Sequence, residues 1–280
     1  MKMFNKIILL FVFLSPAVSA YSQDNVSLKK VTVLVYTKNG KGYVHDNIPS
    51  AVAAIQKLGK EHGFKVDSSA DPKVMTEQNL KQYTMLIFPS TNNDVFDTDA
   101  QRLAFRHYIE AGGGFVGIHS VTGTERNWKW FKNMMGGTFA WHAKFQKFKV
   151  KVIDPTHPSM QGLPKEWEKE DEFYFAKELY PGTKTILAMD ITSLNATDTV
   201  QRNLIIKNEG TFSELYPAAW TNDFDGGHTW FTTLGHHKKD YSDPLYVQLI
   251  FQGIRFVASQ VKKPDFSKAY AESRDTPVRY

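Results

Sequence analysis

The stretch Gly112-Gly113-Gly114-Phe115-Val116-Gly117-Ile118-His119-Ser120 carries the clearest indication of the fold. Its first glycines indicate the end of a helix, because glycine readily adopts the left-handed conformation found there. Residues 115–118 are then a short apolar strand, as found in parallel sheets that are buried on both faces. His119 and Ser120 follow where this strand ends. They are therefore the first candidates for a functional site, since ligands collect beyond the carboxyl ends of parallel strands.

Apolar strands also precede this stretch, at residues 31–36, 64–66 and 85–89. Between them, apolar residues recur at helical spacing from Ile48 to Leu58, and Thr98 opens a second helix before the glycines. Strands that alternate with helices in this way require right-handed crossovers and give a parallel sheet. We therefore expect an α/β protein, a three-layer sandwich with a mainly parallel, flavodoxin-like sheet.

The second half of the chain is less regular. Further strands are expected at residues 144–153, 184–189, 217–220 and 228–234, the last two as a pair turned at residues 225–227. These strands predict antiparallel additions to the parallel sheet. An apolar stripe from Leu245 to Val257 predicts a final helix.

The N-terminus has the layout of a secretory signal peptide. A basic start that includes Lys2 and Lys6 is followed by an apolar run from Ile7 to Leu14 and small residues up to Ala20. We expect residues 1–20 to be a signal peptide, 21–262 one α/β domain and 263–280 an extended tail. The mature chain would be periplasmic or secreted, with no membrane attachment after cleavage.

Composition excludes several functions. The 280 residues include no cysteine, which rules out disulfides and a thiol nucleophile. The formal net charge of +5 includes Lys2 and Lys6 of the signal peptide, and the remaining basic residues are spread along the sequence. The basic stretch 144–151 alternates with apolar residues, as in a strand with one solvated face. We therefore expect no nucleic-acid partner.

The chain has nine histidines, and no HExxH pattern marks a zinc site among them. Four stand at predicted strand ends or in glycine-containing loops, where functional residues concentrate: His45, His119, His142 and His236. Imidazole suits acid–base work because its pKa lies near neutral pH. For each of these four histidines, both a functional role and an ordinary packing role remain open.

An acidic segment, residues 166–174, could complete such a site. Most runs of this kind are a solvated face, but Asp171, Glu172 and Tyr174 adjoin apolar residues and can point inward. A carboxylate beside histidines serves as general base, as a group that orients histidine, or as a metal ligand. Aromatic residues between Trp128 and Trp141 either stack on sugar rings or fill the core.

A serine nucleophile is an alternative. The segment Gly117-Ile118-His119-Ser120-Val121 occupies the strand-to-loop position of a nucleophile elbow, which requires G-x-S-x-G. Here His119 is the middle residue and Val121 replaces the last glycine. Acyl transfer by Ser120 remains open but lacks the full pattern.

Taken together, the motifs resemble the ThuA-like (trehalose utilisation) family, whose fold is similar to the class I glutamine amidotransferase domain. The motifs that carry the resemblance follow in order along the mature chain: residues 43–49, 112–120, 136–142, 157–158, 171–174, 217–220 and 234–236. An amidotransferase would need a cysteine at the position of His119, so the resemblance implies no glutamine hydrolysis. Tyr43 and Val44 depart from the Phe and Arg that are frequent in the family.

The resemblance implies a role in carbohydrate metabolism, with a small-molecule carbohydrate as partner. We expect an enzyme acting on a disaccharide or keto-glycoside, with His119 and Glu172 as the catalytic pair. The expected substrate-binding residues are His45, Ser120, His142, Asp171, Tyr174 and His236. Three interpretations stay open: the imidazoles hold a divalent metal, the protein binds sugar without catalysis, or several copies assemble as a homo-oligomer.

Overall fold

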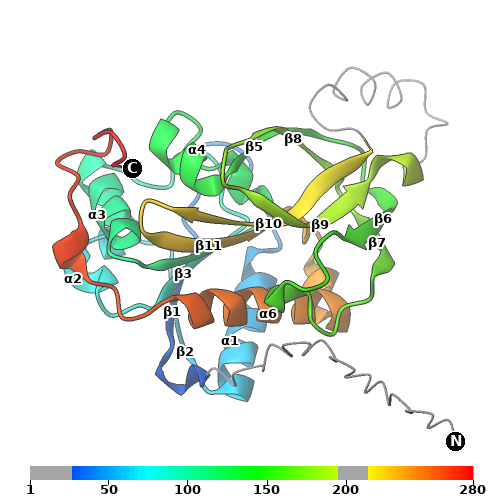
Figure 1. The fold of residues 1–280 in the computed structure, drawn as a ribbon, viewed down its shortest axis with the longest axis horizontal. Coiled ribbons are helices and arrows are strands. Elements are labelled where there is room, and N and C mark those ends of the chain that lie inside the picture. The colour runs from blue at the N-terminus through cyan, green and yellow to red at the C-terminus, as the bar shows by residue number, and fades with distance from the viewer. Residues whose placement is uncertain (1–26, 195–213, 280) are drawn as a thin grey trace, which may run out of the picture.

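The computed structural model describes residues 27–194 and 214–279 (Figure 1). The predicted signal peptide therefore lies outside the described residues. Within them, a nine-stranded sheet has the order β2-β1-β3-β4-β11-β10-β9-β6-β7. A two-stranded antiparallel sheet pairs β5 (Gly137–His142) with β8 (Tyr174–Leu179).

The first part of the large sheet is parallel, as the sequence predicts. The predicted parallel strands are β2 (Lys65–Ser69), β1 (Thr32–Tyr36), β3 (Met85–Pro89) and β4 (Gly114–Ile118). Strand β11 (Gly227–Thr232), expected among the antiparallel additions, pairs antiparallel with β10 but also in parallel with β4, and so extends the parallel part. The antiparallel additions are also confirmed. They comprise β10 (Leu215–Phe224), β9 (Lys184–Asp190), β6 (Gln146–Val152) and β7 (Glu166–Asp171).

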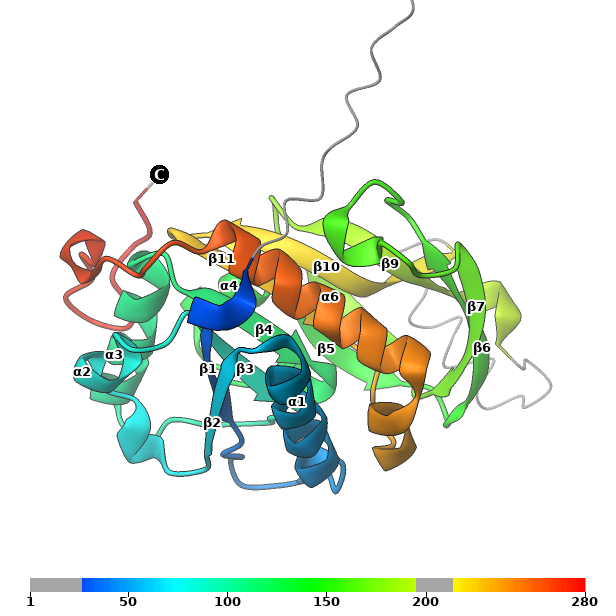
Figure 2. The same cartoon turned by 90° about the horizontal axis from the view of Figure 1, so that it is seen from below.

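Helices cover both faces of the parallel part, which gives the three layers expected. One face carries α1 (Ile48–His62) and α6 (Pro244–Gln260), both visible in Figure 2. The other carries α3 (Asp99–Glu110) and α4 (Lys129–Met135), with the short α2 (Glu77–Leu80) beside α3. The 3-10 helices are η1 (Leu28–Lys30), η2 (Pro72–Val74), η3 (His119–Gly123), η4 (Pro158–Met160), η5 (Ile191–Ser193), η6 (Lys238–Ser242) and η7 (Phe266–Lys268).

Strand β1 shows why the layers form. Its side chains alternate, so that Val33 and Val35 join the core under α1 and α6, whereas Leu34 and Tyr36 join the core under α3 and α4. All four side chains are buried. An apolar run of this kind leaves no polar face for solvent, and only a strand inside three layers can bury both sides.

Residues 263–279, expected as an extended tail, are held against α3. The backbone N–H groups of Tyr270 and Ala271 donate to one carboxylate oxygen of Glu110, at 2.8 and 3.2 Å. The indole of Trp128 donates to the carbonyl of Arg274 at 3.0 Å. Among the described residues, no helix combines the length and apolar composition needed to cross a bilayer.

Candidate functional site

The candidate site lies beyond the carboxyl ends of the parallel strands. His45 comes from the loop after β1, Thr91 from the loop after β3, His119 directly follows β4, and His236 follows β11. Chain segments far apart in sequence thus meet at one edge of the sheet, where this fold binds ligands. The Nε2 atoms of His45 and His119 are 3.2 Å apart, and His236 Nδ1 is 3.3 Å from His119 Nε2.

His119 is at the centre of the cluster and is fully buried. Its backbone has a φ of 56°, a left-handed conformation that costs a residue with a Cβ atom roughly 1–2 kcal/mol. The turn aims the imidazole across the strand ends, and Nδ1 lies 2.9 Å from the carbonyl oxygen of Thr233. A carbonyl only accepts, so Nδ1 carries the proton and Nε2 presents a lone pair to the cluster.

His45 is held in the same way through Ser120. The Ser120 hydroxyl donates to the carbonyl of Thr91 at 3.1 Å, and its oxygen lies 3.1 Å from His45 Nδ1. Because the hydroxyl has one proton, both contacts are made only if His45 Nδ1 donates to the Ser120 oxygen. His45 Nε2 therefore also presents a lone pair.

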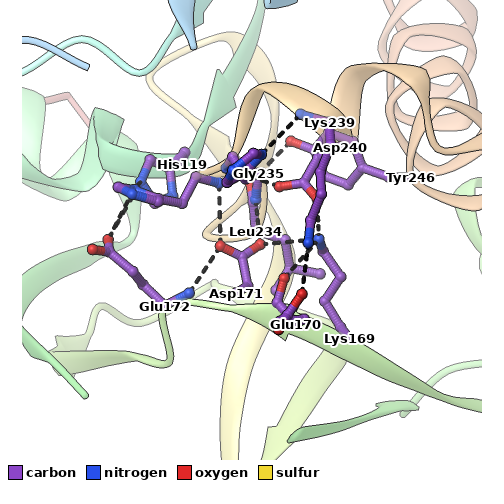
Figure 3. A network of polar contacts seen from close by, with 12 residues as sticks. His119, Lys169, Glu170, Asp171, Glu172, Leu234, Gly235, Lys239, Asp240 and Tyr246 are labelled. Carbon is purple, nitrogen blue, oxygen red and sulfur yellow. Dashed lines mark hydrogen bonds and ion pairs between the residues drawn. The ribbon is translucent and has the colours of Figure 1, made fainter. Parts of the chain in front are cut away.

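Neighbouring carboxylates in the acidic segment point in opposite directions (Figure 3). Glu172 turns into the cluster, where its Oε2 lies 3.2 Å from His236 Nδ1 and 3.7 Å from His119 Nε2. Asp171 is fully buried and turns away, accepting hydrogen bonds from the backbone N–H groups of Gly235 and His236 at 2.7 and 3.1 Å. Asp171 therefore fixes the loop that carries His236.

That loop is braced from several sides. Gly235 has a φ of 108°, and a Cβ atom there would overlap the hydroxyl of Tyr246. The Asn47 amide donates to the carbonyls of Gly235 and His236, both at 2.8 Å. Below it, Lys169 forms ion pairs with Asp171 and Asp240 (Figure 3).

Aromatic side chains and His142 surround the cluster. The Tyr174 hydroxyl lies 3.1 Å from His119 Nε2 and is buried, whereas His142 is 42% exposed with Nδ1 3.5 Å from Glu172 Oε1. Tyr43 is 63% exposed and its ring meets His45 at 4.8 Å, edge to face. Phe145, 39% exposed, has its ring 5.9 Å from that of His236.

The protonation states follow from these surroundings. Burial, reinforced by neighbouring histidines, lowers the pKa of His119 well below its ordinary value and that of His45 to about 4. Burial by itself would raise the pKa of Glu172, but the hydrogen bond with His236 and the nearby imidazoles lower it overall. The same bond raises the pKa of His236. Burial, then the charge of Glu172, raises the pKa of Tyr174.

Of the eight predicted site residues, the structure brings five into mutual contact: His45, His119, Glu172, Tyr174 and His236. His142 borders them, Ser120 supports His45 from behind, and Asp171 supports the His236 loop. Sequence reasoning gave no role to Asn47 or Phe145. Asn47 lies two residues after His45 in the motif at residues 43–49, and this position could have indicated a role in the site. Nothing in the sequence indicated that Phe145 lies beside the site.

The arrangement defines an α/β protein with a histidine–carboxylate site at the carboxyl ends of a parallel sheet. A family model described as ThuA, trehalose utilisation, matches residues 32–257. The chain therefore belongs to the ThuA family, and with it to carbohydrate metabolism in general.

Solved structures share the fold. A ThuA-like protein from Bacteroides uniformis ATCC 8492 is 21% identical with a TM-score of 0.68, covering 88% of this chain and 98% of that one. A ThuA-like protein from Parabacteroides merdae ATCC 43184 is 16% identical with a TM-score of 0.62, covering 82% and 91%. A comparison with curated proteins found no match.

Proposed function

We propose that this chain is an enzyme that acts on a disaccharide or keto-glycoside at the cluster around His119 and Glu172. The observation that carries the proposal is the convergence of three histidines, one carboxylate and one tyrosine hydroxyl at the ligand-binding edge of the sheet. The strained backbone of the buried His119 at the centre of the cluster supports a functional role for this residue beyond packing.

The protonation states suit work on sugar oxygens. Glu172 is ionised and His119 neutral near pH 7, so each can accept a proton from a sugar hydroxyl. Tyr174 keeps its proton and can donate a hydrogen bond to a sugar oxygen on which charge develops. The three groups face one another, which places a donor and two acceptors on one substrate atom or on adjacent atoms.

The exposed rings beside the cluster favour a carbohydrate. Sugars present apolar C–H faces that stack on aromatic rings, and Tyr43 and Phe145 stand exposed against His45 and His236. Rings on both sides suit a substrate longer than one sugar unit. We therefore propose that one unit meets the cluster and the next contacts a ring.

The test uses the mature chain, residues 21–280, with a panel of glucose disaccharides that includes trehalose, and their keto derivatives. Products are separated by chromatography and identified by mass. We expect turnover of at least one compound, falling at least 100-fold in both His119→Asn and Glu172→Gln. Asparagine is chosen because it tolerates the left-handed backbone. His228→Asn, at the opposite end of β11, is the matched control and keeps full activity.

The outcomes separate the alternatives. Sugar binding without turnover of any compound would favour the non-catalytic sugar-binding protein. Turnover that survives both substitutions would contradict the proposed centre. Loss of turnover in Ser120→Ala together with labelling of Ser120 by serine-directed acylating reagents would favour a serine hydrolase.

Tyr43 gives a milder test of substrate contact. Tyr43→Ala removes an exposed ring that contacts His45 but forms no hydrogen bond with Glu172 or His119 in the described residues. We expect KM to rise about 5- to 10-fold with kcat nearly unchanged, because stacking of this kind contributes about 1 kcal/mol. An equal fall in kcat would mean that Tyr43 acts in the reaction itself.

We also propose that the mature protein is exported to the periplasm or secreted, on the basis of residues 1–20. The N-terminal residue of the protein recovered from the producing cells tests this. We expect Tyr21, and recovery of uncleaved Met1 in the cytoplasm would contradict export.

A further inference from the structure

We infer that His45, His119, His236 and Glu172 form a binding site for one divalent transition-metal ion, with zinc the best fit. The inference concerns the same cluster as the proposed function but does not depend on the identity of the sugar. The inference rests on the direction of the imidazole lone pairs and on the distances between the four ligand atoms.

The lone pairs of two neutral imidazoles face each other. Hydrogen bonds to Thr233 and Ser120 place the protons of His119 and His45 on Nδ1, which leaves both Nε2 atoms without a proton at a separation of 3.2 Å. Two lone pairs so close repel unless a proton or a cation lies between them. The Glu172 carboxylate also faces this point, with Oε2 3.7 Å from His119 Nε2, so a metal cation would complement both lone pairs and the carboxylate at once.

The spacing fits zinc. His119 Nε2, His236 Nδ1 and Glu172 Oε2 form a triangle with sides of 3.3, 3.2 and 3.7 Å. A point equidistant from these three atoms is about 2.0 Å from each, which is the usual zinc–nitrogen distance. His45 Nε2 adds the fourth donor, and all four ligand atoms lie within 4.8 Å of one another.

The donor types select the metal. Three imidazoles and one carboxylate suit zinc and its first-row neighbours, whereas magnesium and calcium prefer sets made of oxygen ligands. The supporting groups also match a metal site. Ligating histidines commonly donate their second ring N–H to a carbonyl or hydroxyl, as His119 does to Thr233 and His45 to Ser120.

A bound ion would act as a Lewis acid that polarises a sugar carbonyl or hydroxyl. The ion would occupy the Nε2 lone pair of His119, which can accept a proton only in the metal-free chain. Glu172 would bind the ion through Oε2, which would leave Oε1, beside His142, as the proton acceptor. Tyr174, no longer needed by His119 Nε2, is left to donate to a substrate oxygen.

The test is zinc titration of the chelator-treated full mature chain, followed by calorimetry, with magnesium as a comparison. We expect one zinc ion per chain with a dissociation constant in the micromolar range or below, and no comparable magnesium binding. His119→Asn and Glu172→Gln should weaken zinc binding at least 100-fold, whereas His228→Asn should bind like the unaltered chain. Circular dichroism checks that each variant is folded.

Cobalt provides an independent readout, because four-coordinate Co²⁺ with nitrogen and oxygen ligands absorbs strongly in the visible range. We expect this spectrum in the unaltered chain and in His228→Asn, and its loss in His119→Asn. Absence of zinc binding, or zinc binding that survives both ligand substitutions, would overturn the metal site. If the metal-free chain turns over sugar, the proposed enzymatic function stands even without the metal site. If the chain binds zinc but turns over no sugar, only the proposed enzymatic function is overturned.

Discussion

Two buried polar clusters in this molecule obey different rules. Around Arg106, every charge has its opposite: the guanidinium donates to Glu110 at 2.8 Å, lies 3.5 Å from Asp225 and donates to the carbonyls of Arg274 and Thr276. Around His119, Glu172 pairs with His236, but the unprotonated Nε2 atoms of His45 and His119 face each other at 3.2 Å. A cluster that is complete in itself serves the fold, whereas a cluster whose complement is missing indicates a ligand.

The positions of the clusters agree with this distinction. The Arg106 cluster lies between α3, the β10–β11 turn and residues 270–276, where it joins the C-terminal segment to the domain. The His119 cluster lies at the other end of the strands, under exposed Tyr43 and Phe145. The exposed rings of Tyr43 and Phe145 contact His45 and His236 of the second cluster, and such rings suit a sugar.

The largest expected effect comes from breaking the complete cluster. Arg106→Met leaves Glu110 and Asp225 buried without their common partner, which should lower the free energy of unfolding by about 3–5 kcal/mol. His119→Asn in metal-free protein should cost less, about 1–3 kcal/mol, because it removes the hydrogen bonds with Thr233 and Tyr174 but leaves no buried charge without its partner. Urea denaturation of both variants measures the difference. Equal losses would show that the two clusters serve the fold alike.

An intermediate effect is expected from pH in the metal-free chain. The pKa of His45 is lowered to about 4 and that of His119 is lowered well below its ordinary value, so the unfolded chain binds more protons than the folded chain as pH falls below about 6.5. Folding stability should therefore fall from pH 6.5 toward pH 4, by on the order of a few kcal/mol.

His236 adds the opposite trend at higher pH. Its pKa is raised by Glu172, so its contribution is complete below about pH 6.5 and is lost as pH rises through the folded-state pKa. Stability should thus peak near neutral pH, as measured by thermal unfolding across a pH series. In the double variant His45→Asn/His119→Asn, most of the loss of stability between pH 6.5 and pH 4 should disappear. An unchanged loss of stability in this range would show that these two histidines do not cause it.

The smallest expected effect tests the support behind His45. Ser120→Ala removes the acceptor that holds the proton of His45 on Nδ1, and loss of such a supporting group commonly weakens metal binding 10- to 100-fold. Thr122→Val is the matched control, since the buried Thr122 hydroxyl on the same 3-10 helix has no hydrogen-bond partner in the described structure. Zinc affinity should be unchanged in the control. Equal weakening in both variants would point to general disturbance of the helix.

Much of the fold was predictable because it rests on local patterns. The apolar runs that became β1, β3 and β4 can be buried only between two layers of helices, and the spacing within α1 and α6 marks their buried faces. The same patterns predicted polar residues after each strand. They did not show that β11 would pair in parallel with β4, which is what brings His236 to the strand ends.

The sequence by itself determined the family, the parallel strands of the first half and the residue types available for chemistry. Only the tertiary structure decided that Glu172 faces the histidines while Asp171 faces the backbone, and that Ser120 supports His45. Adjacent residues of an extended segment point to opposite sides, so a one-residue difference in register reverses their roles. The sequence contains the side chains, but the packing of the distant loops determines which of their atoms meet.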